Sequence, residues 1–162
     1  MKKFFQFSET INGTTYFLRI LFSIVLSIPA IIIIFAFFGL FAIEYAEIDM
    51  QNPEGFDQQA FEEKIESNPD EFLETLKSSF TPFWIISIII SLIPVIWFGL
   101  ASYYKRVSAL FFDKRLNIFI GLLIFEILAD IMVIKFDNWI GNMFMAAQII
   151  VLLFMLFKNS GI

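Results

Sequence analysis

Among the polar side chains inside the last two apolar stretches of the chain, four are of types and spacing that could do chemistry there. Glu126 and Asp130 are four residues apart in the stretch 116–134, so on a helix they share one face. Asn142 and Gln148 lie in the next stretch, 139–157. If these stretches cross a membrane, the two acids mark a candidate site for protons or cations, because ionisable groups in lipid are costly.

The spacing of these residues also predicts how they meet. An antiparallel hairpin that turns near residues 135–138 brings Glu126 level with Gln148, and Asp130 level with Asn142. Asn142 and Gln148 are about 120° apart around a helix, so both pairs cannot be direct. Two interpretations of Glu126 remain open: a polar clasp between two helices, or a functional intramembrane carboxyl group. Asp130 is closer to the end of its stretch and to Lys135, which favours a structural role.

Four apolar stretches must position these side chains, at residues 17–43, 83–104, 116–134 and 139–157. Each is close to the roughly 20 residues with which a helix crosses about 30 Å of hydrocarbon. Hydrophobic residues make up 59% of the 162 residues, which is high for a soluble domain. Backbone groups in lipid must bond within their own segment, so the stretches should be helices. The sequence predicts an all-α integral membrane bundle of four transmembrane helices, with residues 1–162 as a single membrane domain.

Two prolines interrupt the first two stretches. Pro29 and Pro94 each lie near the middle of a predicted helix. Proline removes a backbone hydrogen bond, so we expect a helix kink at each position. Paired kinks are compatible with a midplane cavity of the kind found in transporters with broken helices, and equally with ordinary membrane spans.

The basic residues predict the orientation. With the N-terminus inside, most of them lie on the cytoplasmic side, and only Lys64, Lys77 and Lys135 lie outside. That asymmetry follows the positive-inside rule, so we expect a multi-pass protein of the inner (plasma) membrane with both termini cytoplasmic. The short inner loop 105–115 carries four cations that we expect to contact lipid headgroups: Lys105, Arg106, Lys114 and Arg115. The alternative is that these four cations only set the topology.

The segment 44–82 between the first and second spans is strongly acidic. It carries eleven of the chain's 16 acidic residues, and two Asn-Pro-acid motifs recur at 52–54 and 68–70. Asparagine is a good helix N-cap, proline fits the first helical position, and an acid there suits the helix dipole. Apolar stripes follow both motifs: Phe56, Ala60, Phe61 and Ile65, then Phe72, Leu73, Leu76 and Phe80. We expect an acidic extracytoplasmic helical hairpin that either packs on the membrane domain or docks a basic protein partner or cations.

Enzyme motifs are largely absent. The sequence has no histidine and no cysteine, which excludes imidazole-dependent triads and the usual zinc sites. No glycine-rich phosphate loop occurs. We therefore expect no catalytic activity, no cofactor, no metal site and no nucleic-acid partner.

The opening of the chain resembles that of the YhaH-like bacterial inner-membrane proteins, a family of unknown function. The matching positions are Phe7, Ile11, Tyr16 and Phe17, whereas Glu9, Thr10 and Gly13 depart from the family pattern. Lys105 and Arg106 begin a segment similar to that family's Arg-Arg-Leu-His-Asp, with Ser108 in place of the histidine and Asp113 displaced. The resemblance implies a small bacterial inner-membrane protein and supplies no activity.

These observations favour a non-enzymatic structural or interaction component of the bacterial inner membrane. Its expected partners are membrane lipids and a protein at the acidic outer loop. The alternative is a small ion- or proton-coupled transporter or channel that uses Glu126. The sequence does not fix the oligomeric state.

Overall fold

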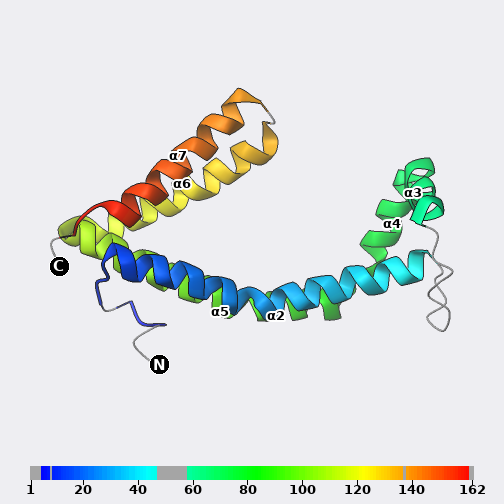
Figure 1. The fold of residues 1–162 in the computed structure, drawn as a ribbon, viewed down its shortest axis with the longest axis horizontal. Coiled ribbons are helices and arrows are strands. Elements are labelled where there is room, and N and C mark those ends of the chain that lie inside the picture. The colour runs from blue at the N-terminus through cyan, green and yellow to red at the C-terminus, as the bar shows by residue number, and fades with distance from the viewer. Residues whose placement is uncertain (1–4, 8, 47–57, 137, 161–162) are drawn as a thin grey trace. The chain divides into compact units, whose positions relative to one another are not determined.

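The chain folds into helices alone over the residues that the computed structural model describes, which are 5–7, 9–46, 58–136 and 138–160. This result confirms the predicted all-α class. The elements in chain order are α2 (Gly13–Tyr45), α3 (Gln58–Ser67), α4 (Pro69–Ser79), α5 (Pro82–Leu110), the 3₁₀ turn η2 (Phe112–Lys114), α6 (Arg115–Lys135) and α7 (Trp139–Phe157) (Figure 1).

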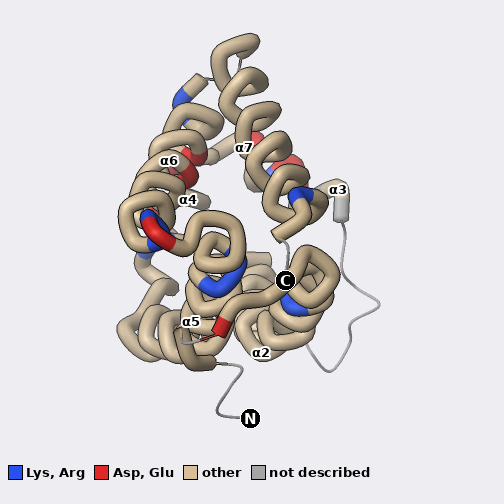
Figure 2. The backbone as a smooth tube through the Cα atoms, turned by 90° about the vertical axis from the view of Figure 1, so that its left-hand side faces the viewer, with Lys and Arg blue, Asp and Glu red and all other residues tan. Residues whose placement is uncertain are grey.

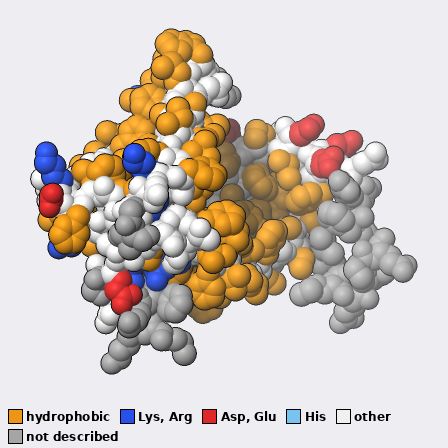
Figure 3. Space-filling model, turned by 60° about the vertical axis from the view of Figure 1, so that its left-hand side comes forward, with side chains coloured by type: hydrophobic (Ala, Val, Ile, Leu, Met, Phe, Trp, Pro, Cys, Tyr) orange, Lys and Arg blue, Asp and Glu red, His pale blue; other side chains and the backbone are white. Residues whose placement is uncertain are grey.

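Four of these helices are long and apolar enough to cross a membrane, as the sequence predicts: α2, α5, α6 with its η2 turn, and α7. At 1.5 Å per residue, α6 and α7 are about 30 Å long, which matches a hydrocarbon core of about 30 Å. Hydrophobic side chains form wide areas of the described surface in Figure 3. This is the outside expected of a multi-pass membrane protein, because lipid demands no polar helix face.

The chain divides into two compact units, and the single membrane domain stays a prediction. Unit 1 contains Met1–Val25 and Val95–Ile162, and unit 2 contains Leu26–Pro94. Both divisions fall at or near a predicted kink, because Pro94 ends unit 2 and Pro29 lies four residues inside it. The two helices nevertheless continue through their prolines.

In unit 2, the later half of α2 packs against the start of α5 and against the helices between them. The Phe37 ring lies 4.2 Å from the Phe80 ring and 5.4 Å from the Trp84 ring. The Tyr45 ring lies 5.3 Å from Phe72 of α4 and 6.1 Å from Phe61 of α3. Phe61, Phe72 and Phe80 of the predicted stripes therefore pack on the membrane helix, which is one of the two arrangements expected, whereas Leu73 is exposed.

The second Asn-Pro-acid motif begins a helix as predicted. Asn68 occupies the N-cap of α4 and Pro69 the first position, with Asp70 and Glu71 in the first turn. The Asn68 side chain makes no capping hydrogen bond, so the proline and the two acids mark this start. The first motif, at residues 52–54, and Phe56 lie outside the described residues.

Unit 1 is built on a core of Ile11, Tyr16, Val107 and Met155, which come from the N-terminal segment, α2, α5 and α7. The start of α2 and the end of α5 pair in antiparallel fashion, since Tyr16 stacks on Tyr103 and Phe22 meets Phe98. Helices α6 and α7 form an antiparallel hairpin beside each other (Figure 1). This unit holds the candidate site.

Helix α5 is longer than the predicted second span, and this corrects the inner loop. The loop expected at 105–115 is helical through Leu110, and only Phe111 and the η2 turn separate α5 from α6. The residues that suggested a loop were Lys105 and Arg106, both fully buried in the structure. Charged residues mark the end of a membrane span only when they face water or headgroups. Here both side chains are enclosed by the rest of the protein.

Candidate functional site

The α6–α7 hairpin holds the candidate site in a fixed register. Asn138 caps α7, because its side-chain oxygen accepts a hydrogen bond from the Ile140 N–H at 2.9 Å. Gly141 is buried in the first turn of α7, where an added Cβ would lie 2.1 Å from the Phe136 carbonyl oxygen. The missing side chain lets the start of α7 approach the end of α6. Residues on the two helices therefore meet at matched depths.

A single amide joins both acids of the hairpin. The Gln148 Nε2 group donates to Glu126 Oε2 at 3.1 Å and to Asp130 Oδ1 at 2.7 Å. Glu126 is half-buried and Asp130 is exposed. Figure 2 shows the acidic positions on α6 beside α7. We call Glu126, Asp130 and Gln148 the acidic cluster.

The acidic cluster has far more acceptors than donors. Gln148 has two N–H donors on Nε2, and the two acids use both. An ionised carboxylate offers about four lone-pair positions, so most acceptor sites of the two acids have no donor within the described part of the chain. Such a cluster can accept cationic or neutral donors, or bind protons.

Of the two predicted pairs, the structure contains Glu126 with Gln148 but not Asp130 with Asn142. Glu126 bonds with Gln148, the residue at its own depth. Asp130 bonds with Gln148 as well, whereas the Asn142 side chain is exposed and makes no hydrogen bond within the described residues. The amide reaches both acids because they are one helical turn apart on the same face of α6. As expected from their angular separation, Asn142 and Gln148 do not both bond to the acids; Gln148 alone bonds to Glu126 and Asp130.

A hollow of about 290 Å³ borders Glu126 on the side of α2 and α5. It is lined by Tyr16, Gly99, Leu100, Tyr103, Leu123 and Glu126. The Tyr103 hydroxyl is buried and has no hydrogen-bond partner in the described residues. Sequence reasoning missed both tyrosines. Tyr16 lies near the start of α2 and Tyr103 near the end of α5. In an antiparallel helix pair these positions are level with each other, and this relation could have indicated both residues.

Arg106 lies in the interior instead of at a headgroup surface. Its guanidinium donates to three backbone carbonyls, those of Met155 at 2.5 Å, Lys158 at 2.5 Å and Ile11 at 3.2 Å. Two of these lie at the C-terminal end of α7, where helix carbonyls lack partners in their own helix and the helix dipole attracts a cation. Arg106 therefore fixes the end of α7 and the N-terminal segment to α5.

Lys105 and Arg19 are also buried. Lys105 has no exposed surface, and Arg19 donates from Nη1 to Ser102 Oγ at 3.4 Å while its guanidinium lies 5.6 Å from the Phe98 ring centre. The structure thus keeps Lys105 and Arg106 away from the headgroup contact predicted for them. Of the four predicted cations, only Lys114 and Arg115 are exposed.

Gly13 completes this end of unit 1. An added Cβ there would lie 1.9 Å from the Leu156 carbonyl oxygen and 3.4 Å from Arg106 Nη2. Only a glycine lets the first turn of α2 approach the last turn of α7 so closely. Opposite ends of two helix dipoles meet at this point, which is favourable.

Metal-ligating side chains do not gather in the described part of the chain: no group of three His, Cys, Asp or Glu residues there could hold an ion. Comparisons with protein-family models, curated proteins and solved structures found no match. The resemblance of residues 7–17 to the YhaH-like proteins stays a prediction. Functional inference rests on the residues themselves.

Proposed function

We propose that this protein is a small non-enzymatic component of a bacterial inner membrane that acts by binding a partner helix through the acidic cluster. The observation that carries the proposal is the shared Gln148 amide, which leaves the two acids short of donors. An exposed Asp130 within a membrane-spanning helix is costly against lipid. A partner helix that supplies a cation, an amide or a hydroxyl would remove that cost.

The orientation belongs to the same proposal. The Lys and Arg asymmetry supports cytoplasmic termini and an extracytoplasmic acidic segment. In that orientation α3 and α4 present their acids outside the membrane while their aromatic stripe contacts α2. The exposed acids provide a second surface suited to a basic protein partner.

Site-specific photo-crosslinking in cells tests the proposal. A photo-crosslinking amino acid at Ile134, which is 85% exposed and one turn from Asp130, should give one defined adduct. The same amino acid at Leu128 is the matched control. Leu128 is exposed but lies about 200° around α6 from Asp130, so it should give none.

The acids themselves provide the second control. The double variant Glu126→Leu, Asp130→Leu should lose the Ile134 adduct while it keeps its level in the membrane. A mass equal to twice that of the chain would identify the partner as a second copy. Equal adducts at both positions, or an adduct that survives the double variant, would contradict the proposal.

A proton- or ion-coupled transporter is the second candidate, and the hollow beside Glu126 favours it. That hollow brings the hydroxyl-bearing Tyr16 and Tyr103 next to a half-buried carboxyl group. The variant Glu126→Gln separates the two candidates. It should retain the crosslink if the cluster binds a partner, and it should abolish proton flux in reconstituted vesicles if Glu126 carries protons.

A further inference from the structure

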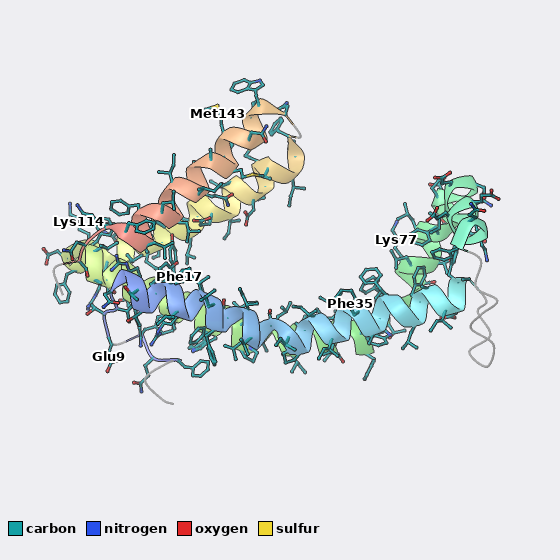
Figure 4. All side chains as sticks on the ribbon, in the orientation of Figure 1. Glu9, Phe17, Phe35, Lys77, Lys114 and Met143 are labelled. Atoms are coloured by element: carbon teal, nitrogen blue, oxygen red, sulfur yellow. The ribbon has the colours of Figure 1, made fainter. Side chains whose placement is uncertain are left out.

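A polar pocket lies in unit 1 at the end where α2 begins, α5 ends and α6 begins. Its volume is about 540 Å³, and it is lined by Phe7, Glu9, Thr10, Tyr104, Ser108, Phe112 and Arg115. The three helix ends belong to one side of the bundle, so the pocket faces the headgroup layer of one leaflet if these helices cross the membrane. Figure 4 shows Glu9 and Lys114 at this same end of the unit.

The walls of the pocket are held in place without a ligand. The Phe7 ring lies 5.4 Å from Trp97 and 5.5 Å from Tyr104, and the Phe5 carbonyl accepts a hydrogen bond from Trp97 Nε1 at 3.1 Å. Phe119 packs on the other side of Tyr104 at 5.2 Å. The N-terminal segment is therefore fixed against α5, and the pocket is pre-formed.

The lining residues offer donors that the protein does not use. Arg115 is exposed and contacts only the Phe112 ring, at 5.1 Å, with no hydrogen bond or ion pair in the described part of the chain. The hydroxyls of Thr10 and Tyr104 make no hydrogen bond there either. Ser108 is 4% exposed and its Oγ is unpartnered among the described residues. A guanidinium beside several hydroxyls is the donor set that binds a phosphate.

Glu9 adds the opposite charge to the same pocket, since its exposed side chain is part of the lining. A carboxylate attracts an ammonium group and repels a second negative charge, so it selects among phosphates by what they carry. An amine-bearing phosphodiester carries a charge complementary to each of the two groups, the Arg115 guanidinium and the Glu9 carboxylate. Phe112, which is 67% exposed, provides an aromatic anchor for the membrane interface at the rim.

We infer that this pocket binds the headgroup of a zwitterionic aminophospholipid, with the phosphate on Arg115 and the hydroxyls, and the ammonium at Glu9. This role is separate from the acidic cluster and does not depend on a protein partner. It differs from a general attraction of cations to anionic lipid, because it needs a carboxylate and a defined cavity.

Lipid binding to the full chain in detergent micelles tests the inference, measured by native mass spectrometry. The probes are dioleoyl phosphatidylethanolamine, dioleoyl phosphatidylglycerol and inorganic phosphate. Phosphatidylethanolamine should bind about tenfold more tightly than phosphatidylglycerol, and Arg115→Gln should weaken it about tenfold, since one charge-assisted contact is lost. The matched control is Lys114→Gln, an exposed cation outside the lining, which should bind as the wild type does.

Two further variants keep the inference open to refutation if Arg115→Gln does not fold. The double variant Thr10→Val, Tyr104→Phe keeps the shape of the lining and should weaken phosphatidylethanolamine several-fold. Glu9→Gln should reduce the preference over phosphatidylglycerol. Equal weakening by Lys114→Gln and Arg115→Gln, or no headgroup preference in the wild type, would overturn the inference. Full displacement of the lipid by millimolar phosphate would instead identify a free-phosphate site and overturn the lipid assignment.

Discussion

Arg106 and the acidic cluster, both in unit 1, differ in how completely the chain satisfies them. Arg106 is fully buried, and its guanidinium donates to three backbone carbonyls from two other parts of the chain. The acidic cluster is half open, and two carboxyl groups share one amide nitrogen. A charged group that bonds to several parts of its own chain holds the fold, whereas a cluster that lacks donors is available to bind something else. The opposite charges of the two sites matter less than this difference in their partners.

The largest expected effect is loss of Arg106. The variant Arg106→Leu leaves three carbonyls without their donor, and each unsatisfied buried acceptor costs about 1–3 kcal/mol. We expect the free energy of unfolding to fall by about 3–5 kcal/mol, measured by steric trapping or by unfolding in mixed micelles. Arg115→Leu, which removes an exposed arginine from the same end, should change it by less than about 0.5 kcal/mol. Similar losses for both variants would show that Arg106 acts only as a surface cation.

Gly13→Ala should be next in size. Its Cβ would meet a backbone oxygen at 1.9 Å, which cannot move without displacing α7. Overpacking of this kind costs about 1–3 kcal/mol. Gly39→Ala is the control, because nothing lies within 4 Å of an added Cβ there, and alanine raises helix propensity. A thermal melt in detergent should show a loss for the first and none for the second, and the reverse order would refute the close approach of α2 and α7.

Removing the shared amide should have a smaller effect on stability. In Gln148→Leu both acids lose the one donor that they have among the described residues, and intramembrane hydrogen bonds are worth about 0.6–1.7 kcal/mol. Asn142→Leu is the matched control, since its exposed amide bonds to neither acid. We expect the Gln148 variant alone to lower the unfolding free energy. Equal losses from both variants would mean that Asn142 also contributes to the contact between the helices. The acidic cluster would then have more donors than Gln148 alone.

The smallest effect belongs to unit 2. Lys64 Nζ donates to the Tyr45 carbonyl at 2.8 Å and lies 4.7 Å from the Tyr45 ring centre, so it caps the end of α2. Lys64→Met should lower stability by about 0.3–1 kcal/mol, because the contact is only partly buried and salt screens it. Lys77→Met is the control on α4. The difference between the two variants should shrink in high salt, and a salt-independent difference would point to packing of the side chain instead.

Local sequence patterns determined the helices of this protein. Hydropathy placed α7 at residues 139–157, and the Asn-Pro-acid motif placed the start of α4 at Pro69. The depth match of Glu126 with Gln148 also followed from sequence, because a short turn fixes the register of an antiparallel hairpin. These features depend on residues within about 20 positions of one another, where helix geometry converts spacing into position.

Only the tertiary structure decided what Lys105 and Arg106 do. Read locally, two cations after an apolar run end a membrane span. In the structure the helix continues through them, and Arg106 donates to carbonyls of α7 and of the N-terminal segment that are 49 and 95 residues away. The sharing of Gln148 by both acids, and the pocket that joins Glu9 to Arg115, likewise need side-chain directions and long-range packing. Hydropathy measures the free-energy cost of moving a residue out of water. The free energy of a buried charge also depends on which groups, often distant in sequence, replace the water as its hydrogen-bond partners.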